Sequence, residues 1–121
     1  MFGDGTQTRD YVYAGDVAAA NFAVATSSTL PAPGRIDARA FNIGTGVETS
    51  VNTLATTLST VSRATAPVEY APARAGELAR SALETSKAKH VLGWTPTVSV
   101  TEGLTNTFKY FADVRSGAAK R

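Results

Sequence analysis

Residues 3–16 read GDGTQTRDYVYAGD, and this stretch supplies the turn and the strand around which the rest of the chain can be placed. Its two glycines and its first aspartate are residue types that favour a tight turn. The composition of Thr8–Tyr13 is typical of a β-strand. Asp16 then stands where a carboxylate can cap or charge-stabilise a helix, which we expect to continue to about Thr26.

A second helix is predicted immediately after residue 50. Thr49 or Ser50 supplies a hydroxyl that can cap its first turn. The apolar residues that follow recur at three- and four-residue spacing, as on the core-facing side of a helix. This stripe consists of Val51, Leu54, Ala55, Leu58 and Val61.

Two further helices are predicted in the last third of the chain. One covers about residues 86–92 and stops at Gly93, a residue type that commonly ends helices. The other opens at the pair Ser99 and Glu102, which has the spacing of a capping box. We expect Trp94 to be a packing anchor between them. The predicted buried face of the last helix is formed by Leu104, Phe108 and Phe111.

Two short segments are candidates for additional strands. Residues 40–43, AFNI, are apolar and precede two glycines, and residues 67–70, PVEY, precede an irregular loop at 71–81. Short strands alternating with about four helices indicate the α/β class, or α+β when the unit is isolated. Three short strands are too few to form a stable parallel sheet by themselves. We therefore expect this single unit, residues 1–121, to require a partner surface.

Composition excludes several classes of function. The chain has no cysteine and one histidine, His90, which we expect to be exposed, so no metal site or thiol chemistry is indicated. The net charge of +2 gives little support to nucleic-acid binding. No apolar run has the length of a membrane span, and the first residues do not resemble a secretory leader, so a cytoplasmic location is expected.

Arginines near glycine-bearing turns are the first candidates for binding. Arg9 can form bidentate bonds with phosphate oxygens, although this residue taken alone favours a surface ion pair, for example with neighbouring Asp10. Arg74 and Arg80 share one loop with Glu77, and two guanidiniums with a carboxylate suit a diphosphate and a ribose diol. A solvated charged loop is the alternative explanation for that segment.

The segment FNIGTG, residues 41–46, begins like a dinucleotide-binding turn but lacks its third glycine, because Thr49 stands at that position. No acidic residue follows at the usual distance on a second strand. We therefore interpret it as a turn between a strand and a helix, without a cofactor role.

Three segments together, GDGTQTRDYVYAGDVAAA, FNIGTGVETSVNTLA and YAPARAGELARSALETSKAKHVLGWTPTVSVTEGL, resemble the nucleotide-sugar epimerases and dehydratases, UDP-glucose 4-epimerases in particular. The similarity covers nearly the whole chain, in the right order. It implies the carboxy-terminal part of an extended short-chain dehydrogenase that lacks the amino-terminal Rossmann domain. It also implies that a complete enzyme, an isomerase, would use NAD and a UDP-sugar.

The resemblance carries specific residue roles. The family's arginines in the GDG-x-Q-x-RD and R-x-G-[DE] segments contact the nucleotide diphosphate, which implies this role for Arg9 and Arg74. The acidic residue after the glycine holds the ribose, which implies Glu77, and Tyr11 is a further substrate contact. Ser81 stands where some epimerases place a tyrosine against the substrate.

The residues of the family's chemistry are not found in this sequence. No Tyr-x-x-x-Lys pair occurs, because the residues four positions after the four tyrosines are Gly15, Val17, Arg74 and Val114. We therefore expect the isolated chain to be inactive and to bind no NAD. Two alternatives remain: a self-associating fragment, as a homodimer or larger oligomer, or a portion of a nucleotide-sugar dehydratase. Residues 115–121 are expected to form a disordered tail.

Overall fold

The computed structural model describes residues 1–117 and contains four helices and one small sheet. The helices are α1 (Ala14–Thr26), α2 (Val51–Ser62), α3 (Ser86–Leu92) and α4 (Val100–Ser116). The strands are β1 (Thr8–Asp10) and β2 (Glu48–Ser50), which pair antiparallel with Arg9 opposite Thr49. None of the helices in the described part of the chain is long and apolar enough to cross a membrane.

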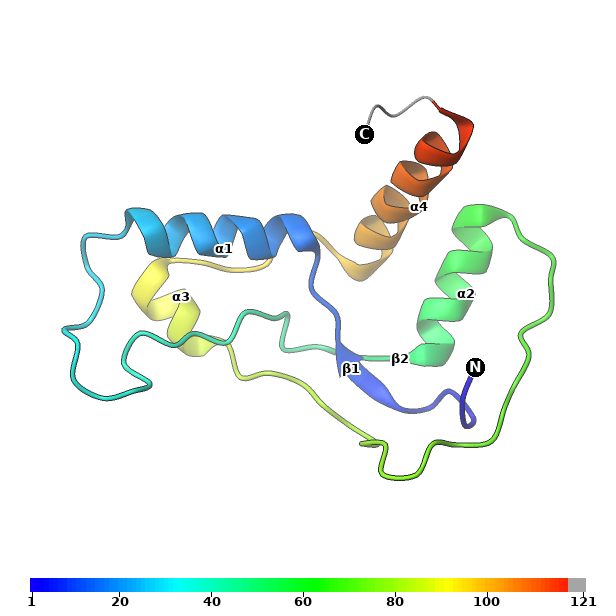
Figure 1. Cartoon of the computed structure of the whole chain (residues 1–121), viewed down its shortest axis with the longest axis horizontal. Helices are drawn as coiled ribbons and strands as arrows, with labels where there is room; N and C mark the ends of the chain where they lie inside the picture. Colours follow the sequence, from blue (N-terminus) through cyan, green and yellow to red (C-terminus); the bar gives the residue numbers. More distant parts are fainter. Residues whose placement is uncertain (118–121) are drawn as a thin grey trace.

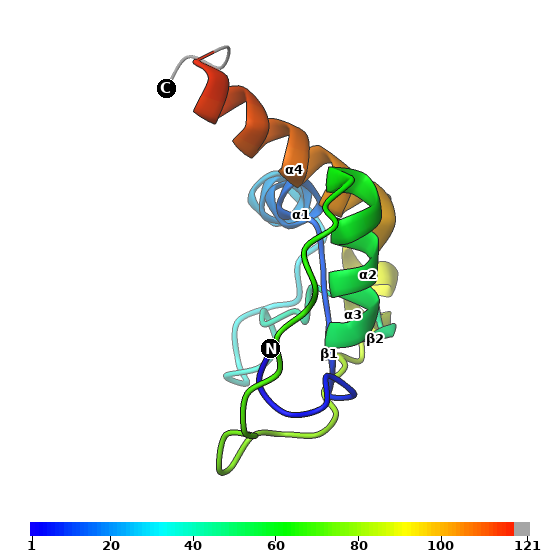
Figure 2. The same cartoon turned by 90° about the vertical axis from the view of Figure 1, so that its right-hand side faces the viewer.

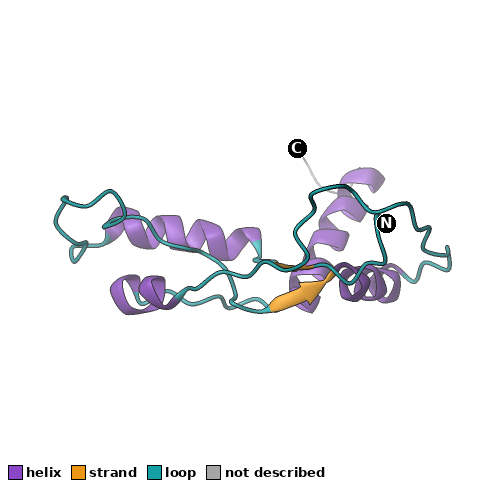
Figure 3. Ribbon diagram, turned by 90° about the horizontal axis from the view of Figure 1, so that it is seen from below, coloured by secondary structure: helices purple, strands orange, loops and turns teal. Residues whose placement is uncertain are grey.

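The unit is elongated, with two helix pairs at opposite ends and the sheet between them (Figures 1 and 3). α1 packs against α3, and α2 packs against α4. Figure 2 shows α2 and α4 side by side above the strands. The α/β sequence prediction is therefore realised as a small antiparallel sheet with helices at each end, the α+β form expected for the isolated unit.

The buried core is small and lies between α1 and α3. Ala20, Ala88 and Trp94 are its buried apolar residues, with Trp94 only 7% exposed. Four partly buried side chains pack around them: Val12, Phe41, Ile43 and Leu92. The prediction of Trp94 as a packing anchor is confirmed. Such a core is thin for a chain of this length, because burial of apolar area is the main favourable term in folding.

Two of the predicted strands are wrong. Residues 40–43 form no strand in the described structure, although Phe41 and Ile43 still face the core. Residues 67–70 are irregular and lead to a single bridge between Ala71 and Phe2. An apolar segment becomes a strand only when a neighbouring backbone is available to pair with it. The strand predicted for 8–13 is real but ends at Asp10.

The helix predictions are largely confirmed. Ser50 accepts a hydrogen bond from the Thr53 amide, and Ser99 accepts one from the Glu102 amide, as helix-capping hydroxyls do. Gly93 ends α3 with a φ of 65°, a conformation that favours glycine. His90 is exposed.

The predicted buried face of α4 is wrong for two of its three residues, since Leu104 is half-buried but Phe108 and Phe111 are exposed. Phe108 and Phe111 are 37% and 64% exposed, and the buried residue of α4 is Gly103. A Cβ added there would lie 3.3 Å from the Tyr13 ring, so the first half of α4 packs closely against the entry to α1. The stripe on α2 is also incompletely covered, since Leu58 is 38% exposed.

The tail prediction needs a correction at its start. Arg115 and Ser116 belong to α4, and Gly117 caps it in a left-handed conformation, so these residues continue the helix rather than begin a tail. The remaining residues of the predicted tail, 118–121, lie outside the described part of the chain.

Asp16 lies in the first turn of α1, where its charge was predicted to be, but it does not act as the predicted cap. α1 begins two residues before it, at Ala14, and the Asp16 carboxylate forms no cap. Instead the carboxylate accepts hydrogen bonds from the Thr97 hydroxyl at 2.7 Å and from the amides of Thr97 and Val98 at 3.1 and 3.0 Å. Its backbone carbonyl accepts the Trp94 indole N–H at 3.1 Å. Asp16 thus joins α1 to the segment before α4.

Replacing Asp16 with asparagine should destabilise the fold by about 2 kcal/mol, because a buried amide group would then face donors that now reach a carboxylate. The shift in urea midpoint, followed by Trp94 fluorescence, measures this loss. Asp37→Asn, in an exposed loop, is the matched control and should leave the midpoint unchanged.

Because of the Asp16 carboxylate, we expect the stability of the fold to decrease in acid. Burial raises the pKa of Asp16, but the hydrogen bonds from Thr97 and Val98 outweigh burial and hold the pKa below its usual range. Its stabilisation is therefore fully present above the unfolded-state pKa, about 4, and is lost as pH falls through the folded-state pKa. An Asp16→Asn chain that loses stability in acid as steeply as the wild type would contradict this role.

Candidate functional site

An open cleft of about 570 Å³ lies between the turn before β1 and the loop that follows residue 72. Residues of the first segment are Gly3, Asp4, Thr6 and Gln7, and residues of the second are Ala73, Arg74, Glu77, Leu78, Ala79 and Arg80. Its volume lies within the range of about 300–1,000 Å³ that is usual for ligand pockets. The cleft brings together three residues that the sequence singled out as binding candidates, Arg74, Glu77 and Arg80.

The turn that forms one wall depends on its glycines. Gly3 and Gly5 have positive φ angles of 70° and 75°. A Cβ at Gly5 would lie 2.2 Å from the Asn52 side-chain oxygen, so the turn packs directly against the start of α2. Asn52 also donates a hydrogen bond from its side chain to the Asp4 carbonyl at 3.0 Å.

Arg74 extends over the ring of Phe2, with its guanidinium carbon 3.8 Å from the ring centre. This stacking orders the planar group by a cation–π contact while leaving its N–H edge available. Within residues 1–117, Arg74 has no ion pair and no side-chain hydrogen bond. It is therefore a positioned cation with unused donors at the cleft.

Arg9 reaches the same loop from β1 but is not part of the cleft lining. Its guanidinium donates to the Leu78 carbonyl at 2.8 Å and to the Thr8 carbonyl at 2.6 Å. It also lies 3.7 Å from the Glu77 carboxylate. The ion pair with Asp10 that the sequence suggested is not formed. Arg9 thus contacts the loop that carries Arg74, at Glu77 and Leu78.

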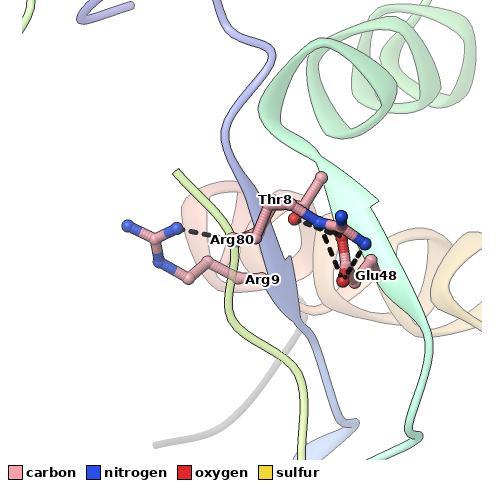
Figure 4. Close-up of polar contacts among 4 residues, drawn as sticks. All are labelled: Thr8, Arg9, Glu48 and Arg80. Carbon is pink, nitrogen blue, oxygen red and sulfur yellow. Dashed lines mark hydrogen bonds and ion pairs between the residues drawn. The ribbon is translucent and has the colours of Figure 1, made fainter. Parts of the chain in front are cut away.

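Arg80 points across β1 to the opposite side from Arg9 (Figure 4). Its Nε and Nη2 atoms donate to both oxygens of Glu48 on β2, at distances of 2.8–3.2 Å. The same carboxylate accepts the Thr8 hydroxyl at 2.8 Å. The hydrogen bonds from Arg80 and Thr8 lower the pKa of Glu48 and keep it charged. The idea of Arg74 and Arg80 as an equivalent pair therefore does not hold.

Tyr11 lies apart from the other predicted substrate residues. It lines a second, mainly apolar pocket with Tyr13, Leu54 and the start of α4. The structure thus gathers Arg74 and Glu77 in one cleft, joins Arg9 to it through the loop, and places Tyr11 elsewhere.

The glycine turn at residues 44–46 is filled by the protein's own carboxylate. Asp10 accepts hydrogen bonds from the Thr45 amide and hydroxyl at 2.7 and 2.6 Å and from the Gly46 amide at 2.8 Å. It also accepts one from the Leu83 amide at 3.3 Å. A Cβ at Gly44 would lie 2.6 Å from Asp10, so the glycine is required by this carboxylate. Because these amides are occupied, the turn does not fit a dinucleotide pyrophosphate, and no step involving NAD is derived from it.

The contacts of two carboxylates were not predicted from the sequence: Asp10 binds the glycine turn at 44–46, and Glu48 binds Arg80 of the cleft lining. Burial raises the pKa of Asp10, and its bonds from Thr45, Gly46 and Leu83 outweigh this effect and lower it. The available signal was the position of each carboxylate beside a glycine-rich or arginine-bearing segment. Among the described residues, no group of three histidine, aspartate or glutamate side chains is placed to hold a metal ion.

Comparison with known proteins agrees with this arrangement. The family model described as GDP-mannose 4,6 dehydratase matches residues 1–107. The chain is 43% identical over 111 residues to a UDP-glucose 4-epimerase of Mycolicibacterium smegmatis, covering 92% of this chain and 33% of that protein. The chain belongs to the NAD-dependent epimerase/dehydratase family of extended short-chain dehydrogenases.

Solved structures of this epimerase/dehydratase family show the same fold. The Thermotoga maritima UDP-glucose 4-epimerase, determined with UDP-glucose, matches with a TM-score of 0.82 and 40% identity, over 95% of this chain and 35% of that one. A Bacillus cereus UDP-glucuronic acid 4-epimerase, with UDP-glucuronic acid and NAD, matches with a TM-score of 0.81 and 28% identity, over 94% and 35%. The chain therefore spans about a third of the length of these relatives and corresponds to their carboxy-terminal portion.

Proposed function

We propose that this chain is the substrate-binding portion of a nucleotide-sugar epimerase and that its cleft receives the nucleotide diphosphate. The observation that carries this proposal is the position of Arg74 in the cleft, stacked on Phe2 with unused donors. Guanidinium donors match the oxygens of a phosphate group in pairs.

Glu77 and Arg9 have separate roles in this proposal. Glu77 lines the cleft and offers carboxylate oxygens to the ribose diol, and in the ligand-free chain Arg9 lies 3.7 Å from it on the β1 side. Arg9 comes to the diphosphate when the ligand displaces the weak 3.7 Å contact with Glu77. Tyr11 remains a proposed substrate contact only where the ligand extends beyond the cleft, because it lies in the second pocket.

We further propose that the complete enzyme interconverts UDP-glucose and UDP-galactose. Support comes from the Mycolicibacterium smegmatis and Thermotoga maritima relatives, both UDP-glucose 4-epimerases. NAD, which the Bacillus cereus relative holds, would accept and return the hydride in that enzyme. No residue of this chain is assigned to that step. A nucleotide-sugar dehydratase is the alternative that the GDP-mannose 4,6 dehydratase family model supports.

Binding of UDP, measured by calorimetry, tests the proposed function. UDP should bind more tightly than UMP, and UMP more tightly than uridine, since the proposed contacts are to phosphate. Arg74→Ala should weaken UDP binding roughly tenfold, because it removes charged hydrogen bonds. Arg35→Ala makes the same charge change on an exposed loop and should have little effect. Equal affinity for UDP and uridine, or a preference for NAD over UDP, would count against the proposal.

A self-associating fragment is the second candidate, and exposed apolar side chains favour it. Phe22, Ile36, Tyr110 and Phe111 are 71%, 102%, 60% and 64% exposed. Tyr110 and Phe111 lie next to each other on α4, with ring centres 5.4 Å apart, and exposed apolar surface promotes association between chains.

Light scattering separates the two candidates. If association is the function, the chain should form a defined oligomer whose mass is the same with and without UDP. Phe111→Ser should then dissociate it without changing Trp94 fluorescence. A monomer that binds UDP would contradict the second candidate and support the first.

A further inference from the structure

The loop of residues 73–80 has no helix or strand, and its residues are exposed. Gly76 turns it with a φ of 78°, and the Glu77 amide donates to the Arg74 carbonyl at 3.3 Å across that turn. Such a segment is positioned by its few attachments to the rest of the protein rather than by its own structure. Those attachments decide where Arg74 and Glu77 lie.

One attachment uses the edge of β1 that β2 leaves free. The Thr8 amide donates to the Ala79 carbonyl at 2.9 Å, and the Arg9 guanidinium donates to the Leu78 carbonyl at 2.8 Å. These bonds fix the backbone of the loop against one side of the strand. They do not hold Arg80, whose side chain leaves the loop in the opposite direction.

Besides the Arg74–Phe2 stacking and the Arg9–Glu77 contact, a further attachment is the bond between Arg80 and Glu48. It crosses β1 and joins the end of the loop to β2, with Thr8 donating to the same carboxylate (Figure 4). A guanidinium that faces a carboxylate with two of its nitrogens has a defined direction as well as a favourable energy. The loop is therefore held on both sides of a three-residue strand.

We propose that Glu48 is a positioning residue for ligand binding: through Arg80 it holds the 73–80 loop so that Arg74 and Glu77 face one anionic ligand. The inference rests on the proposed function of the cleft and adds a residue that does not line it. Glu48 acts through another residue and does not contact the ligand.

The exposure of the pair shows that its role is local. The Arg80 side chain is 76% exposed and that of Glu48 is 31% exposed. Surface ion pairs contribute little to global stability. Loss of the pair should therefore leave the fold intact, yet it removes one of the loop's few attachments, so the ordering of the loop must then be supplied during binding.

A simple electrostatic role predicts the opposite sign. If Glu48 only neutralises Arg80, its removal frees a cation of the cleft lining and removes a negative charge, and anions should bind more tightly. If Glu48 positions the loop, its removal should weaken binding although the charge becomes more favourable. The sign of one change in affinity separates these roles.

The decisive variant is Glu48→Gln, compared with wild type for UDP affinity and for hydrogen exchange of the ligand-free chain. UDP should bind about 3- to 10-fold more weakly, the loss expected from poorer preorganisation. The amides of Thr8 and Glu77 should exchange several-fold faster, because their acceptors belong to the loop. The amide of Trp94, which reports the core, should not change.

Two further variants serve as control and confirmation. Glu102→Gln makes the same chemical change on α4, where the side chain forms no hydrogen bond in the described structure, and should leave both measurements unchanged. Arg80→Lys keeps the charge but loses the paired donors, so it should reproduce the effect of Glu48→Gln.

Unchanged or tighter UDP binding by Glu48→Gln, or unchanged exchange at Thr8 and Glu77, would overturn the positioning role. If the wild-type chain binds no UDP, the proposed function fails, and the exchange comparison then decides separately whether Glu48 holds the loop.

Discussion

The site depends on a strand of three residues, β1, that is bonded along both edges. β2 pairs with one edge, and the end of the 73–80 loop is bonded to the other through the Thr8 amide. Side chains alternate in direction along a strand, so Arg9 is directed to one side while Thr8 and Asp10 are directed to the other. Because of this alternation, one short strand contacts the 73–80 loop through Arg9, pairs with β2, and binds the glycine turn at 44–46 through Asp10.

Two carboxylates join segments that a larger apolar core would otherwise hold together. Asp10 gathers the amides of Thr45, Gly46 and Leu83, and Asp16 gathers those of Thr97 and Val98. Each carboxylate satisfies several backbone donors from segments that have no regular structure, as buried polar groups require. The small core around Trp94 accordingly covers only one end of the unit, and the aromatic side chains of α4 are left exposed.

Local signals in the sequence predicted the helices well. Ser50, Ser99 and Gly93 act within one turn of their own positions, so their effect is visible without knowledge of the fold. The strands at 40–43 and 67–70 and part of the buried face of α4 were wrong because each depends on a partner distant in sequence. Apolar periodicity shows that a face can be buried, but not that something covers it.

In the candidate site, too, local sequence signals were informative and contacts between residues distant in sequence were not predicted. Residue chemistry and the resemblance identified Arg74 and Glu77, and the structure places both in one cleft. The partners of Arg9 and Arg80 could not be foreseen, because Glu77 and Glu48 lie 68 and 32 positions away from them and are reached only through the pairing of β1. Tyr11, next but one to Arg9, lies in another pocket because the strand ends before it.

Mapping of UDP on the isotopically labelled chain by amide chemical shifts tests the central claim most directly. We expect UDP to shift the amides of residues 3–9 and 73–80 and to leave those of α3 and α4 unchanged. Shifts concentrated around Tyr11, Tyr13 and the start of α4, or no saturable shifts near Arg74, would contradict it.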